Sequence, residues 1–205
     1  MTLSQAINGA LSKLPAWTIY IVCALWTVWL FYLAITGGLG VEPINALERR
    51  YGELGLKLLV LGLLVTPLRK WTGVNLLKFR RAIGVSAFFL VLAHFSVWAI
   101  LDVRSLDAVW TEIVKRPYVT VGMASFVLMI PLAVTSNNRS VRKLGAVTWR
   151  NLHKLTYPVA ILAVVHYLWL VKGFQIEPII YAVIIAGLLI ARLRKPKPAG
   201  ARQAA

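Results

Sequence analysis

Cysteine and histidine are scarce in this sequence of 205 residues, which contains one cysteine and three histidines. A single cysteine excludes a disulfide framework within the chain, and it excludes any zinc or iron–sulfur site built from several cysteines. The sequence also lacks a G-x-G-x-x-G run and a P-loop. These absences exclude the usual dinucleotide-binding and ATP-binding sites.

Acidic residues are scarce as well, because seven Asp and Glu stand against 23 Lys and Arg and give a formal net charge of +16. In a soluble protein such a charge would indicate nucleic acid as a partner. Here 59% of the residues are hydrophobic, which is more than a soluble globular domain needs. The composition therefore predicts an integral membrane protein that binds no nucleic acid and owes its charge to membrane topology.

Six apolar segments are each close to the length of about 17 to 25 residues that a helix needs to cross the hydrocarbon core. We therefore predict an all-α membrane protein with six transmembrane helices over residues 17–192, between a cytoplasmic segment 1–16 and a basic cytoplasmic tail 193–205. The first apolar run is longer than a signal-peptide core, so we expect it to be retained. The predicted spans are 17–36, 53–68, 82–101, 118–135, 155–171 and 177–192.

The charged residues predict how these spans are oriented. The segments 69–81, 139–154 and 192–202 carry Lys and Arg but no acid, whereas all seven acids lie in or beside the alternate loops. Cytoplasmic loops collect Lys and Arg, so both termini are predicted to be cytoplasmic. The third and fifth spans then run in the same direction, from the inside to the outside.

Two of the three histidines lie at the same depth in these parallel spans. His94 is 12 residues after Ala82 and His166 is 11 residues after Leu155, which places both about 17 to 18 Å from the inner edge. Imidazole is a strong iron ligand that is costly to leave unpaired in hydrocarbon. Two imidazoles facing each other inside a bundle supply both axial ligands of a b-type heme, which needs no C-x-x-C-H motif. A transporter whose histidines relay protons is the distant alternative.

His153 lies 13 residues before His166, a rise of about 20 Å that places it at the cytoplasmic mouth of the fifth span. A second heme would suit this rise, although an ideal helix turns the two rings about 140° apart. At this level the third span offers arginines and no histidine. His153 is therefore interpreted either as a ligand or heme-edge residue, or as a structural histidine. Three arginines either pair with heme carboxylates or only reflect the topology: Arg80, Arg81 and Arg150.

Two stretches of the sequence resemble a known family. They are RRAIGVSAFFLVLAHFSVW at 80–98 and TSNNRSVRKLGAVTWRNLHKLTYPVAILAVVHYLWL at 135–170. Both are similar to the ferric-reductase-like transmembrane domain, and specifically to the bacterial heme-binding membrane subunits of the periplasmic methionine sulfoxide reductase system. The resemblance covers nearly all six spans, and it implies a multi-heme electron conduit with ligands at His94, His153 and His166. Eukaryotic NADPH oxidases and ferric reductases of this family carry a second histidine on the third span and a flavin domain, and this chain has neither.

The resemblance also implies the cellular role. The protein would lie in the bacterial inner membrane and take electrons from the quinone pool or a cytosolic flavin reductase. It would pass them to a periplasmic, molybdopterin-containing methionine sulfoxide reductase that repairs oxidised periplasmic proteins. The implied cofactors are one or two hemes b, together with FMN. We therefore expect an electron-transfer subunit of an oxidoreductase system, not its catalytic subunit, and the nearer alternative is a stand-alone ferric reductase or oxidase.

Overall fold

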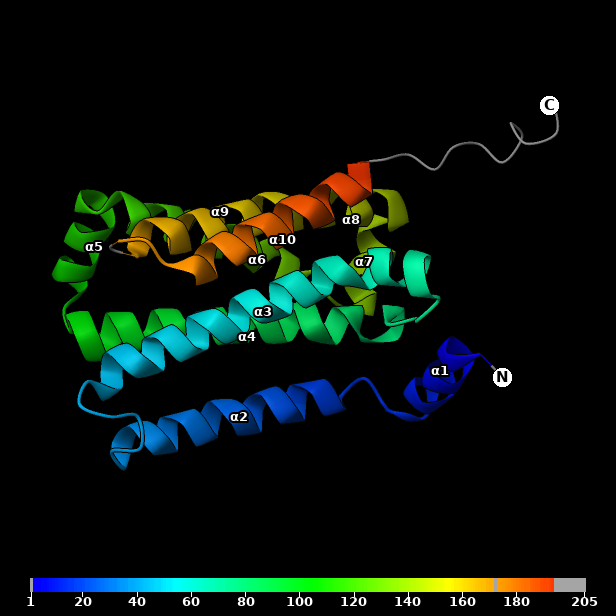
Figure 1. The fold of residues 1–205 in the computed structure, drawn as a ribbon. Coiled ribbons are helices and arrows are strands. Elements are labelled where there is room, and N and C mark those ends of the chain that lie inside the picture. Colours follow the sequence, from blue (N-terminus) through cyan, green and yellow to red (C-terminus); the bar gives the residue numbers. More distant parts are fainter. Residues whose placement is uncertain (1, 172, 194–205) are drawn as a thin grey trace.

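The computed structural model describes residues 2–171 and 173–193, and this part of the chain consists of helices and the turns between them (Figure 1). The predicted all-α fold is confirmed over these residues. Three short helical turns adjoin the longer helices: 3₁₀ turns at Leu77–Phe79 and His153–Leu155, and a π-helical turn at Val97–Val103. The α-helices are α1 Leu3–Lys13, α2 Thr18–Ile35, α3 Pro43–Thr72, α4 Arg80–Ser96, α5 Leu106–Lys115, α6 Pro117–Val134, α7 Asn138–Leu144, α8 Ala146–Leu152, α9 Thr156–Leu170 and α10 Ile176–Leu193.

Four helical runs are long and apolar enough to cross a membrane, as expected of a multi-pass membrane protein. They are Thr18–Ile35, Pro43–Thr72, Leu77–Val103 and Pro117–Val134, and they match the first four predicted spans. α9 and α10 have 15 and 18 residues and coincide with the fifth and sixth predicted spans. The six crossings therefore stay a prediction, of which four are supported by length and composition.

The second span is longer than the predicted segment 53–68. α3 begins at Pro43, where the fixed φ of proline suits the first turn of a helix, and it has 30 residues. Its first turns carry Glu48, Arg49 and Arg50, which conceal the helix from a search for apolar residues alone. The earlier start matters because this part of α3 supplies contacts to the candidate site.

α3 lies at the centre of the bundle, where it contacts α2, α4, α9 and α10. Leu56, Leu59 and Leu63 recur on one face of α3 at helical spacing, and they pack into apolar clusters with side chains from the neighbouring helices. α2 differs, since Leu30 is its only buried residue. Ile19 and Ala34 also pack against the bundle, but most other apolar side chains of α2 are exposed, as expected of a helix that borders lipid.

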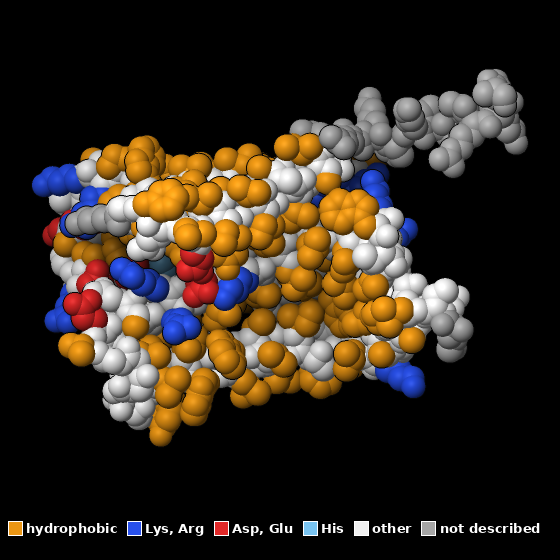
Figure 2. All heavy atoms as spheres, viewed as in Figure 1, with side chains coloured by type: hydrophobic (Ala, Val, Ile, Leu, Met, Phe, Trp, Pro, Cys, Tyr) orange, Lys and Arg blue, Asp and Glu red, His pale blue; other side chains and the backbone are white. Residues whose placement is uncertain are grey.

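The two ends of the bundle differ in charge. α1 and the last turn of α10 lie at one end, and α5 lies across the other (Figure 1). On the face drawn in Figure 2, Asp and Glu occur only in the half that carries α5, whereas Lys and Arg occur at both ends around a broad apolar belt. The acids thus gather at one end of this face, and the orientation in the membrane stays a prediction. The predicted tail lies, from residue 194 onward, outside the described residues.

Candidate functional site

His94 on α4 and His166 on α9 face each other inside the bundle. Their ring centroids are 6.3 Å apart, and the ring planes are inclined by 77°. An imidazole nitrogen binds a transition metal at about 2.0 to 2.1 Å, and the ring centre lies about 1.2 Å behind that nitrogen, so two rings on opposite sides of one metal stand about 6.4 Å apart. The separation of the two rings therefore fits a shared metal.

Each of the two rings is held by a hydrogen bond from its own Nδ1. His94 Nδ1 is 2.9 Å from the carbonyl oxygen of Glu48 on α3, and His166 Nδ1 is 2.7 Å from the carbonyl oxygen of Tyr118 on α6. A carbonyl can only accept, so Nδ1 of each neutral ring carries the proton and donates it. This tautomer leaves Nε2 of each ring without a proton, and such a nitrogen is a metal ligand.

A glycine makes each of these hydrogen bonds possible. A Cβ atom at Gly52 on α3 would lie 3.1 Å from His94 Nδ1, and one at Gly122 on α6 would lie 2.7 Å from His166 Nδ1. In both helices the accepting carbonyl belongs to the residue four positions before the glycine, one turn away. The imidazole therefore reaches the carbonyl across the space that a side chain would fill. Our sequence analysis did not identify these two glycines, although a glycine within an apolar helix is the signal for such a close approach.

The donor set fits a heme better than a free metal ion. Within the described residues, no group of three or more His, Cys, Asp or Glu side chains converges on one point. Two imidazoles alone do not complete the four-coordinate site that zinc prefers. The two imidazoles would instead be enough to hold a heme, because the macrocycle supplies the other ligands of its iron.

His153 occupies a different environment, in the turn between α8 and α9. Its Nε2 is 3.1 Å from Thr135 Oγ1, and its ring stacks on Trp149 with the centroids 3.8 Å apart. The Thr135 hydroxyl donates to the Pro131 carbonyl at 2.6 Å, which leaves its oxygen to accept the Nε2 proton of His153. Partial burial, and then the positive charges of two nearby arginines, lower the pKa of His153. The ring is therefore neutral at pH 7, and its Nε2 is engaged by the protein.

The three predicted arginines lie at the same end as His153. Arg81 donates from Nη1 to Asn138 Oδ1 at 2.8 Å, and Arg150 on α8 is exposed. Arg80 is close enough to Tyr157 and Arg192 to interact with both electrostatically. Arg80 begins α4, 14 residues before His94. It is therefore about 21 Å from His94 along the helix. The arginines therefore do not line the site between His94 and His166.

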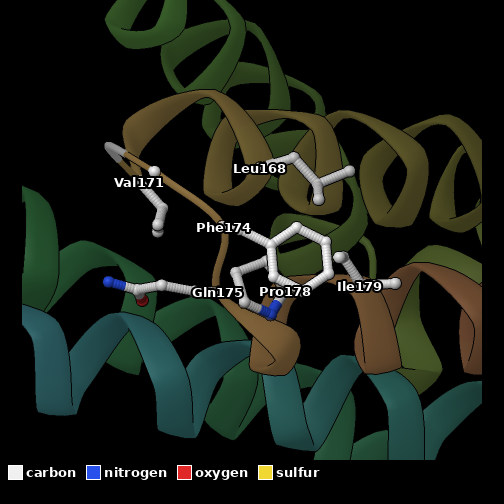
Figure 3. Close-up of a pocket in the computed structure, with 7 residues that line it drawn as sticks. Leu168, Val171, Phe174, Gln175, Pro178 and Ile179 are labelled. Atoms are coloured by element: carbon white, nitrogen blue, oxygen red, sulfur yellow. The ribbon is translucent and has the colours of Figure 1, made fainter.

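A small pocket lies where α9 turns into α10 (Figure 3). It is lined by side chains such as Leu168, Phe174 and Pro178, and its volume is about 80 Å³. Sites for small-molecule ligands have volumes of about 300 to 1,000 Å³. The pocket is therefore too small for a heme or a flavin and contributes nothing to the histidine site.

Comparison with known proteins places the chain in a family. The family model for the ferric reductase like transmembrane component matches residues 51–164, from within α3 to within α9. Proteins of Brucella ovis, Brucella canis and Brucella suis, each named "Protein-methionine-sulfoxide reductase heme-binding subunit MsrQ", are 47% identical over 181 residues, which is 88% of this chain and 82% of each relative. No solved structure matches the chain. With this identity over most of its length, the chain belongs to the ferric reductase like transmembrane family and, within it, to the group of the MsrQ subunits.

Proposed function

We propose that this protein is a b-type heme electron-transfer subunit of the bacterial inner membrane, in which His94 and His166 would together hold one heme. The observation that carries the proposal is the paired arrangement of the two rings, 6.3 Å apart, each donating from Nδ1 to a backbone carbonyl. The names of the MsrQ relatives support the same role. The chain is then an electron carrier and not the catalytic subunit.

The chain contributes position and electronic environment. A bound heme supplies an iron that gains and loses one electron. The carbonyl oxygens of Glu48 and Tyr118 fix the tautomer and the orientation of the two imidazoles, and they make each Nε2 a stronger donor to iron. Apolar side chains of α3, α4, α6 and α9 surround this part of the bundle. Such surroundings exclude water and help to set the potential at which an electron is passed on.

The depth of the histidine pair favours transfer of electrons to the outside. His166 lies four residues before the end of α9, which corresponds to about 6 Å along the helix. That end of the bundle carries α5 and the acidic residues, and the predicted topology places it on the periplasmic side. This depth suits an acceptor on the periplasmic side. From the names of the MsrQ relatives and from the family, we propose that the acceptor is a periplasmic methionine sulfoxide reductase, with molybdopterin in its catalytic subunit and oxidised periplasmic proteins as its substrates.

Other parts of the proposal follow from family membership alone. The electron donor would be the quinone pool or a cytosolic flavin reductase, and FMN would be a second cofactor. A second heme would lie at the level of His153, with Arg80, Arg81 or Arg150 as partners for its carboxylates. In that case Nε2 of His153 would have to leave Thr135, because it donates to that hydroxyl now.

An absorption spectrum of the full chain, purified in detergent after heme-replete expression, tests the proposal. We expect the Soret and α bands of a low-spin heme. Protein without a Soret band would refute the heme role and favour the proton-relaying transporter.

The acceptor is tested by reducing the protein and following heme reoxidation by stopped flow. Adding the purified catalytic subunit should accelerate reoxidation, whereas acceleration by ferric citrate or oxygen alone would favour the stand-alone reductase or oxidase.

A further inference from the structure

Arg192, in the last turn of α10, directs its guanidinium toward α3. Its Nη2 donates to the carbonyl oxygen of Leu63 at 2.6 Å. This carbonyl has no donor within α3, because residue 67, four positions later, is a proline and has no N–H. Arg192 Nη1 also donates to the Tyr157 hydroxyl at 3.3 Å, and the guanidinium lies 5.5 Å from the centre of the Tyr157 ring. The side chain is thus held by partners on α3 and α9, and all of these partners are neutral.

The positive charge of Arg192 has no matching negative charge at this end of the bundle. The ion pairs within the described residues are Lys57–Glu53 and Arg116–Glu112, and both lie on other parts of the molecule. The nearest acids in the sequence belong to the opposite loops, and Arg192 Nε is buried without a hydrogen-bond partner. Neutral acceptors satisfy N–H groups but do not balance a partly buried charge, whose desolvation is costly.

A second guanidinium adds positive charge to the surroundings of Arg192. Arg80, at the start of α4, is close enough to Arg192 and Tyr157 to interact with both electrostatically. Its side chain is exposed, so a ligand can reach it from outside the bundle. Two like charges that lie together without an acid repel each other, and an anion between them would relieve the repulsion.

We propose that Arg80 and Arg192 bind the phosphate of an anionic phospholipid from the inner leaflet. Guanidinium groups present a planar set of N–H donors that matches phosphate oxygens. Under the predicted topology, the end of α10 and the start of α4 lie at the inner boundary of the membrane. Basic pockets between transmembrane helices on that side bind anionic headgroups.

Native mass spectrometry of the full, delipidated chain tests the proposal with phosphatidylglycerol and phosphatidylcholine as probes. Wild-type protein should retain phosphatidylglycerol at least tenfold better than phosphatidylcholine, whose choline cation would face the two guanidiniums. Arg80→Gln should weaken phosphatidylglycerol binding about tenfold, the effect of one charge-assisted hydrogen bond. Arg142→Gln is the matched control, because Arg142 is an exposed cation of α7 at the same end. It should bind as the wild type does.

Three outcomes would overturn the proposal. One is equal binding by the Arg80→Gln and Arg142→Gln variants, which would show that total charge attracts the lipid. Another is displacement of the lipid by inorganic phosphate at equal concentration, which would make this a site for free phosphate. The third is an Arg80→Gln variant that loses heme absorbance but keeps its lipid, since Arg80 would then hold a heme carboxylate. Lipid binding is read from mass, so it can be measured whether or not the protein binds heme.

Discussion

At the end of the bundle that carries α5, His94 and His166 donate from Nδ1 to backbone carbonyls and leave Nε2 free. At the opposite end, His153 uses Nε2 in a hydrogen bond to Thr135 and stacks on Trp149. The same residue type therefore presents an unprotonated Nε2 in one place and has its Nε2 engaged by the protein in the other. The difference arises from the neighbouring backbone, since a glycine opens a carbonyl to each of the outer two rings.

Substitution of single histidines tests the difference between His153 and the pair His94 and His166, and it should give the largest change in heme binding. His94→Ala or His166→Ala should abolish the low-spin heme spectrum, because each removes one of two axial ligands. His153→Ala should only reduce the heme content. Heme absorbance per protein, together with low-temperature EPR, measures both. Equal and small losses in all three variants would contradict the assignment of the outer pair.

The two glycines should have graded effects. In Gly122→Ala the added Cβ would meet His166 Nδ1 at 2.7 Å, so the ring must move away from the Tyr118 carbonyl. Loss of such an orienting hydrogen bond lowers metal affinity by about 10- to 100-fold. In Gly52→Ala the corresponding distance to His94 Nδ1 is 3.1 Å, and we expect a smaller loss.

Gly84→Ala is the matched control for these variants, since Gly84 also lies within a helix but a Cβ there would have no neighbour within 4 Å. It should keep its heme and gain up to about 1 kcal/mol of stability from better helix propensity. Heme titration of the apoprotein and the redox midpoint potential are the measurements. A Gly122→Ala protein that binds heme as Gly84→Ala does would show that the Tyr118 carbonyl does not orient the ring.

Apolar runs predicted the six long helices and the shared depth of His94 and His166, because both follow from spacing along one chain. They did not predict the short helices α1, α5, α7 and α8 or the early start of α3. The partners of these histidines come from other helices, at a separation of 46 residues for Glu48 and 48 for Tyr118. A single sequence does not show which backbone carbonyls will face them. Arg192 was interpreted only as a topological charge, and its inward turn depends on the carbonyl that Pro67 frees on α3.

The link between Arg192 and Pro67 can be measured as a coupling energy. Arg192→Met should destabilise the fold by about 1 to 3 kcal/mol, because the buried Leu63 carbonyl would lose its only strong donor. Pro67→Ala would supply an N–H from within α3, so the same arginine substitution should cost less in that background. Unfolding free energies of the wild type, the two single variants and the double variant, measured in mixed micelles, give this coupling energy as a double-mutant cycle. Equal costs in both backgrounds would mean that Arg192 acts through the Tyr157 ring instead.

The smallest effect concerns the end of the bundle that holds His153. Burial and the nearby charges of Arg80 and Arg81 lower its pKa from the ordinary 6.5. The folded state therefore binds fewer protons at this position than the unfolded state does, so stability falls as the pH drops below about 6.5 and continues to fall toward the folded pKa. Thermal melts between pH 7.5 and 5.5 should show a slightly steeper loss for the wild type than for His153→Gln, which keeps a side-chain amide to donate to Thr135. If the stability of the two proteins changed with pH in the same way, the His153 ring would lie in open solvent. The contrast between His153 and the pair formed by His94 and His166 would then be lost.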